Sequence, residues 1–140
     1  MSKRILMFAA LLGLMACEPV SENVIPFRNT IEIPKYFYDG ALNAGIAGQI
    51  AAECSGLEYN SKKAAVYEAE LTERARADGL TKAQDIIAGN NLPERQLQKD
   101  LFAYIQKRKI VVVSPDTWCA AGRAEISEKT EIGNLLLEKG

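Results

Sequence analysis

Three cysteines, Cys17, Cys54 and Cys119, are the residues of this chain whose chemistry is easiest to specify. The chain contains no histidine, which removes the most common general base, the catalytic triads that depend on it, and most zinc and haem sites. Cys54 and Cys119 form no Cys-x-x-Cys motif, so a thiol redox site is not indicated. No phosphate-binding glycine loop is present either. These patterns predict neither a cofactor nor a metal site.

Carboxylates are the remaining side chains that could act as general acids and bases in catalysis. The chain has 18 Asp and Glu residues scattered along its predicted helices, and no spacing singles out a catalytic pair. Acidic residues of this kind ordinarily lie on a solvated surface. We therefore expect a protein without catalysis of its own, and an enzyme built on carboxylates is the least favoured alternative.

The first segment, Met1–Ala16, has the composition of an export signal. Lys3 and Arg4 precede an uncharged apolar run over residues 5–16, which is too short to span a bilayer as a helix. The run ends in Leu14-Met15-Ala16-Cys17, which resembles the bacterial lipobox, where the cysteine receives a lipid such as palmitate and becomes the mature N-terminus. The alternative is ordinary cleavage with loss of Cys17, although Leu14 is bulky where such a site needs a small side chain.

The predicted processing fixes the compartment, the charge and the fate of the other cysteines. The sequence predicts a lipoprotein on the periplasmic side of the cell envelope, at the inner or the outer membrane. Removing Lys3 and Arg4 from 17 basic residues leaves 15 against 18 acidic ones, a net charge of −3, which is no footprint for nucleic acid. With Cys17 acylated, Cys54 and Cys119 remain as a pair in an oxidising compartment, and we expect a disulfide between them.

The pattern after the signal predicts an extended tether followed by helices. Residues 17–34 contain Pro19, Pro26 and Pro34 and form the tether, with a short strand over Thr30–Ile33. A helix over Lys35–Cys54 follows, because apolar residues recur there every four positions, at Leu42, Ile46, Ile50 and Cys54. Small residues recur at the same spacing and predict a closely packed neighbour, at Gly40, Ala44, Gly48 and Ala52.

Helix signals continue through the middle of the chain. A second helix over Ser61–Asp78 buries Ala64, Tyr67, Leu71 and Ala75, and pairs Glu70 with Arg74 on its surface. Gly79 and Leu80 give it a left-handed stop. Thr81 and Gln84 open a short helix through Ile87. The next helix begins at Pro93, with Leu97, Leu101, Tyr104 and Ile105 facing inward and Lys107, Arg108 and Lys109 at its negative end.

The last part of the chain completes the prediction of an all-α domain over residues 35–140. Ile110–Val113 is β-branched throughout and is predicted to be an extended, buried connector rather than an exposed edge. Ser114-Pro115 begins a final helical region that breaks near Thr130. We expect a small orthogonal bundle of about five helices with one disulfide.

The densest constellation is Trp118-Cys119-Ala120-Ala121-Gly122-Arg123-Ala124-Glu125-Ile126. Helical spacing places Cys119, Gly122, Arg123 and Ile126 on one face. We expect Gly122 to leave room beside the disulfide and Trp118 to cover it. Packing is the favoured role, with Arg123 joining a carbonyl or carboxylate at a helix junction. The alternative is a partner interface made of Trp118, Arg123 and Glu125.

The cysteine after the first helix, the stretch from Trp118 to Ile126, and Ile132-Gly133-x-Leu-Leu together resemble a family of small exported alphaproteobacterial proteins of unknown function. The likeness covers Tyr36 to Leu137. It implies an all-helical domain with a Cys54–Cys119 disulfide and supplies no catalytic residue. It also implies a respiratory complex as one kind of partner.

These observations predict a lipid-anchored periplasmic protein that binds or assembles another envelope protein. The alternative is a helical module that binds a small apolar or peptide ligand between its helices.

Overall fold

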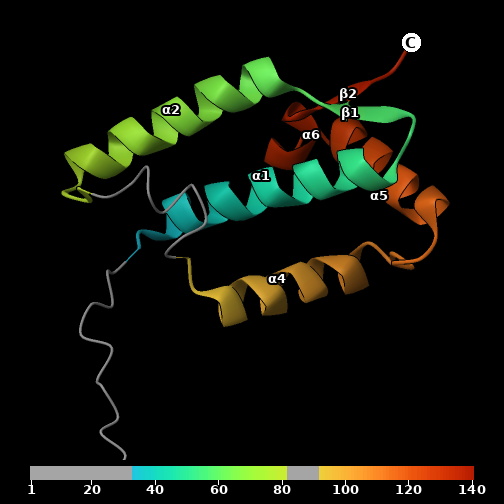
Figure 1. Ribbon diagram of the computed structural model, residues 1–140, viewed down its shortest axis with the longest axis horizontal. Coiled ribbons are helices and arrows are strands. Elements are labelled where there is room, and N and C mark those ends of the chain that lie inside the picture. The colour runs from blue at the N-terminus through green and yellow to red at the C-terminus, as the bar shows by residue number, and fades with distance from the viewer. Residues whose placement is uncertain (1–32, 82–91) are drawn as a thin grey trace, which may run out of the picture. The chain divides into compact units, whose positions relative to one another are not determined.

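The computed structural model describes residues 33–81 and 92–140 of the chain. They belong to one compact unit that extends over Glu32–Gly140. The predicted signal peptide, Cys17, nearly all of the tether with its strand, and the predicted short helix after Thr81 lie outside the described residues. The labels of the helices and strands below are those of Figure 1.

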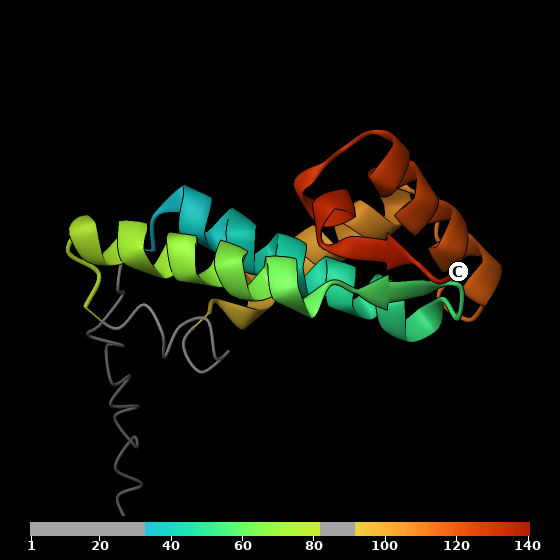
Figure 2. The same ribbon diagram turned by 90° about the horizontal axis from the view of Figure 1, so that it is seen from above.

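Helix α1 (Lys35–Glu53) is the element on which the other helices of the described chain pack. It contacts α2 (Ser61–Ala77), α4 (Glu94–Lys107), α5 (Pro115–Ser127) and α6 (Glu131–Asn134). In Figures 1 and 2, α1 and α2 run side by side and antiparallel, whereas α4 crosses α1 at an angle in Figure 2. The prediction of about five helices is confirmed in the described residues.

Two short strands are absent from the sequence-based prediction, so the fold is mostly helical rather than all-α. Strand β1 (Leu57–Tyr59) follows α1, and β2 (Leu136–Glu138) lies near the C-terminus. They pair antiparallel, with Leu57 opposite Glu138. Strands of three residues carry too little alternation to be recognised from the sequence. Their pairing holds the last residues of the chain against the segment that follows α1.

Three helices end in the same left-handed turn. At the end of α2, Gly79 has a φ of 90°, and the Leu80 N–H donates to the Ala75 carbonyl at 2.8 Å, which confirms the predicted stop. Lys109 and Lys129 take positive φ values at the ends of α4 and α5, and Ile110 N donates to Ile105 O at 2.9 Å. A lysine in this position carries no sequence signal, because glycine is the residue that favours it.

The left-handed turn at Lys109 explains why the prediction for Ile110–Val113 is wrong. Ile110 is buried, as expected of the apolar residue after such a turn. The three valines that follow form an exposed turn, with Val113 89% exposed, and not a buried extended connector. We call residues Val111–Val113 the valine turn.

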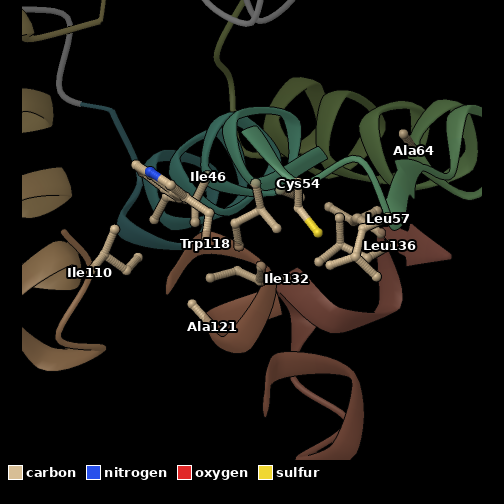
Figure 3. Close-up of a cluster of buried hydrophobic side chains, with 12 residues drawn as sticks. Ile46, Cys54, Leu57, Ala64, Ile110, Trp118, Ala121, Ile132 and Leu136 are labelled. Atoms are coloured by element: carbon tan, nitrogen blue, oxygen red, sulfur yellow. The ribbon is translucent and has the colours of Figure 1, made fainter. Parts of the chain in front are cut away.

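Buried apolar side chains form two clusters in the described residues. The larger one joins α1, β1, α2, α5, α6 and β2, and Figure 3 shows its members gathered between these elements, among them Ile46, Leu57, Trp118 and Leu136. The smaller one contains Phe37, Ala75 and Leu80, where the start of α1 meets the end of α2. The first cluster is the main core, since it includes all but one of the helices and both strands.

The predicted pattern of small residues on α1 contains two glycines, Gly40 and Gly48, and only Gly40 lies close against a neighbouring helix. A Cβ on Gly40 would overlap Leu71 Cδ1 of α2, so the predicted close neighbour is present there. A Cβ on Gly48 would meet nothing within 4 Å. A tighter approach occurs in α5, where a Cβ on Gly122 would overlap Leu57 Cδ1 and lie 2.6 Å from Ile50 Cγ2.

Replacing Gly122 by alanine should lower the free energy of unfolding by about 1–3 kcal/mol, because the added methyl group overpacks the contact with Leu57 and Ile50. Gly48→Ala is the matched control, since it has open space and should raise stability by up to about 1 kcal/mol. Urea denaturation of both variants measures the difference. Equal effects of the two substitutions would contradict close packing at Gly122.

Candidate functional site

The predicted disulfide is present. Cys54, the residue after α1, is joined to Cys119 in α5, with their Cα atoms 5.0 Å apart. The bond closes a loop with a sequence separation of 65 residues, for which loop-closure entropy gives about 4 kcal/mol of stabilisation. The Cys54 side chain is fully buried in the main core. The disulfide therefore ties the end of the central helix to the most distinctive stretch of the sequence.

The buried face of α5 differs from the predicted one. Trp118, Ala121, Gly122 and Glu125 are buried, at the spacing of one helical face. Arg123 lies on the exposed side, while Cys119 and Ile126 are partly buried. Gly122 makes room for Leu57 and Ile50. The face that Cys119, Gly122, Arg123 and Ile126 share is therefore offset by one position from the buried face.

Glu125 is the most unusual residue of this face, because its carboxylate is charged and its exposed fraction is 2%. Arg108, at the end of α4, donates from Nε to Glu125 Oε1 at 2.7 Å, and Tyr104 of α4 donates to the same oxygen at 3.0 Å. The Thr130 hydroxyl, before α6, donates to Oε2. Three residues from two segments, α4 with its end and the start of α6, thus supply the partners of one carboxylate, and we call this arrangement the Glu125 junction.

Arg108 extends the junction toward solvent. Its two terminal nitrogens donate to Glu128 at 2.8 and 2.6 Å, in the paired geometry that suits guanidinium and carboxylate. These bonds lower the pKa of Glu128 and, with Glu125, raise that of Arg108. A carboxylate with a lowered folded-state pKa stabilises the fold above its unfolded-state pKa, and this contribution is lost as pH falls through the folded-state value.

Thr130 has a second role at the junction. Its hydroxyl accepts a hydrogen bond from Gly133 N at 3.0 Å and so caps the short helix α6. A Cβ on Gly133 would overlap the Glu125 carbonyl, which shows how closely α6 lies against the end of α5. The next residue, Glu131, accepts hydrogen bonds from Asn43 of α1 at 2.7 Å and Tyr67 of α2 at 3.1 Å. Burial, followed by the charge of Glu131, raises the pKa of Tyr67 to about 12.

Trp118 is buried and holds the valine turn. Its indole N–H donates to the Val112 carbonyl at 3.1 Å. In Figure 3 the indole points away from the sulfur of Cys54, so the expectation that Trp118 covers the disulfide is wrong. Thr117 supports the same turn, because its hydroxyl oxygen accepts a hydrogen bond from Val111 N at 3.0 Å. With an exposed fraction of 2%, Trp118 has a packing role in this conformation.

Arg123 is the candidate interface residue that the structure leaves accessible. Its side chain is 59% exposed and lies 4.0 Å from the Glu138 carboxylate of β2, which is equally open to solvent. Such a pair contributes little to stability. Cys17, the predicted lipidation site, lies outside the described residues, so of the predicted site residues only Arg123 presents a largely exposed side chain.

Sequence reasoning missed the functional importance of Arg108 and Thr130. Arg108 was assigned to the helix dipole, and Thr130 only marked a break. The spacing of Glu125 seven residues after Trp118 is the signal that could have identified it as buried, because seven residues are two helical turns. Nothing local in the sequence pairs it with an arginine seventeen residues earlier.

The described residues contain no group of three or more histidine, cysteine or acidic side chains placed to hold a metal ion. None of the helices in residues 33–81 and 92–140 is long and apolar enough to cross a membrane. Every buried side-chain nitrogen and oxygen in this part of the chain has a hydrogen-bond partner.

Together these features define a small, mostly helical domain with one disulfide and a closed network of buried polar groups. The model of a family of unknown function (DUF5333) matches residues 29–137. The chain belongs to this family. No curated protein and no solved structure matches the chain.

Replacing Glu125 by glutamine should lower the free energy of unfolding by about 2 kcal/mol, since it replaces the buried carboxylate to which Arg108, Tyr104 and Thr130 donate by a neutral amide with one acceptor oxygen fewer. Glu128→Gln is the matched control. It removes the exposed carboxylate that pairs with the same arginine, and it should lower the free energy of unfolding by less. Chemical denaturation compares the two. If Glu125→Gln is no more destabilising than the control, the junction does not stabilise the fold.

Proposed function

We propose that this protein is a lipid-anchored component of the cell envelope, on the periplasmic side, that binds or assembles another envelope protein and performs no chemistry itself. A lipid on Cys17 attaches it to the membrane, and the helical domain carries the binding surface. A respiratory complex is the kind of partner that the sequence resemblance favours.

The observation that carries this proposal is the closed Glu125 junction. Glu125 is the one strongly buried carboxylate of the described residues, and Arg108, Tyr104 and Thr130 occupy both of its oxygens. A general acid or base must reach a substrate proton, whereas this carboxylate is already committed to three neighbours. The polar group that would suit an enzyme best therefore supports the fold, and the exposed surfaces remain for recognition.

A second candidate function is supported by a hollow between α1, α2 and α4. The described residues enclose about 460 Å³ there, within the usual range for small-molecule sites. Its lining is mainly apolar and includes Leu42, Leu71, Leu97 and Leu101. A small apolar or peptide ligand is the occupant such a lining favours. Saturable binding of a fluorescent fatty acid, weakened by Leu97→Gln with the thermal midpoint kept, would favour this function over the first.

The proposed anchor predicts a lipid on Cys17. The full-length wild-type protein should remain with the membrane fraction, because acyl chains supply the affinity that the apolar run of the signal cannot retain after cleavage. Cys17→Ser should move the protein to the soluble periplasmic fraction. Intact-mass measurement of the wild type is the direct check, and an unmodified N-terminus that begins at another residue would contradict the anchor.

The proposed binding role predicts that Arg123→Ala loses an envelope partner without loss of stability. Arg123 is exposed and only weakly paired, so its removal should leave the thermal midpoint unchanged. Arg76→Ala, an exposed arginine of α2, is the matched control and should keep the partner. Crosslinking in intact cells followed by mass spectrometry measures both. A wild-type chain that crosslinks to no envelope protein would refute the binding role.

A further inference from the structure

The outer face of α4 and the valine turn that follows it combine exposed basic side chains with exposed apolar ones. The face has a regular stripe of exposed side chains, Arg95, Lys99, Phe102 and Gln106, at the spacing of one side of a helix. Phe102 is 60% exposed within it. The opposite side of α4 packs inward through Leu101, Tyr104 and Ile105. The helix therefore presents a basic and aromatic face to solvent.

Charge is distributed unevenly between this segment and the rest of the chain. Apart from Arg108, which is paired with Glu125 and Glu128, residues 92–114 contain four basic residues and two acidic ones, Glu94 and Asp100, a net charge of +2. The chain without Met1–Ala16 has a net charge of −3. Asp100 also accepts hydrogen bonds from Tyr38 and Gln96. Arg95, Lys99, Lys107 and Lys109 thus form a local positive surface on an acidic protein.

The valine turn adds apolar side chains that are held outward. Val111, Val112 and Val113 are 53%, 59% and 89% exposed. Three of the backbone groups beneath them are paired internally: Val111 N donates to Thr117 Oγ1, and Val111 O and Val112 O accept from Ser114 N and the Trp118 indole. Paired backbone groups lower the cost of entering a medium with little water. The turn is therefore a preformed apolar tip beside basic side chains.

We propose that the outer face of α4 and the valine turn dock on an anionic lipid bilayer. Basic side chains attract anionic headgroups, while valine and phenylalanine enter the interface, as in helices that lie on membranes. Valine is under-represented at the energetic centres of protein interfaces, and the one tryptophan of the chain is buried beneath the turn, so a protein partner fits less well.

The proposed anchor is long enough to allow this contact. The inference rests on the proposed membrane attachment, which would bring the bilayer within reach of the domain. Residues 18–34 can extend over at most about 55 Å, while the 19 residues of α1 span about 28 Å. Either end of α1 could therefore come to the lipid surface, and docking would fix the orientation in which the domain meets its partner.

Binding of the mature chain with Cys17→Ser to lipid vesicles tests the proposal without the lipid anchor. Vesicles that contain phosphatidylglycerol should bind this chain, and vesicles of phosphatidylcholine alone should bind it much less. Each basic residue near an anionic surface contributes about fivefold in affinity. Arg95→Gln with Lys99→Gln should therefore weaken binding by about 25-fold. The matched control is Lys62→Gln with Lys63→Gln, an exposed basic pair on α2.

The apolar contribution has its own matched pair. Val112→Ser should weaken vesicle binding by up to about tenfold, whereas Val66→Ser on α2, with the same exposed fraction of 59%, should not. Unchanged thermal midpoints confirm that the variants fold. The proposal is overturned if the chain binds no anionic vesicles, if the controls weaken binding equally, or if the α4 variants keep vesicle binding and lose only a crosslinked protein. These results are independent of whether Cys17 carries a lipid.

Discussion

The structure depends on the requirement that Glu125 be neutralised where it is buried. A carboxylate that is 2% exposed cannot remain charged without close partners, because taking it out of water costs several kcal/mol. Arg108 supplies the opposite charge from α4, and Thr130 supplies a hydroxyl from the start of α6. The end of α4, the second half of α5 and the start of α6 are consequently held at one point. Loss of the pairing would leave a buried charge at the place where these elements meet.

Close approach of the elements around α5 follows from the same arrangement. Gly122 lets Leu57 and Ile50 come against the helix axis, and Gly133 lets α6 lie on the backbone of Glu125. In the first half of α5, Cys119 forms the disulfide with Cys54, the residue that follows α1. Polar pairing, small residues and a covalent bond therefore act on different turns of one short helix. This explains why the stretch from Trp118 to Ile126 is the most distinctive part of the sequence.

The helices and the disulfide were predictable from the sequence because their signals are local or depend on composition. Apolar periodicity identified α1, Gly79 marked the end of α2, and the predicted export with acylation of Cys17 left two cysteines to pair. The features that the sequence did not predict depend on backbone conformation without a glycine or on packing between distant segments. Lys109 and Lys129 take the left-handed conformation without a glycine to announce it, so the β-branched run after Lys109 was wrongly predicted to be buried and extended. The partner of Glu125 depends on packing between α4 and α5, which no local pattern encodes.

The error over the valine run is informative about function as well as fold. If the run were a buried connector, its three valines would lie in the core and packing alone would explain them. The left-handed turn at Lys109 instead places only Ile110 inside and turns the valines outward, supported by Thr117 and Trp118 from the first turn of α5. These valines leave most of their apolar area in water, which is unfavourable. The indole of Trp118 fixes the backbone of this turn without burying its valines, and this is the arrangement from which we propose that the valines contact a lipid surface.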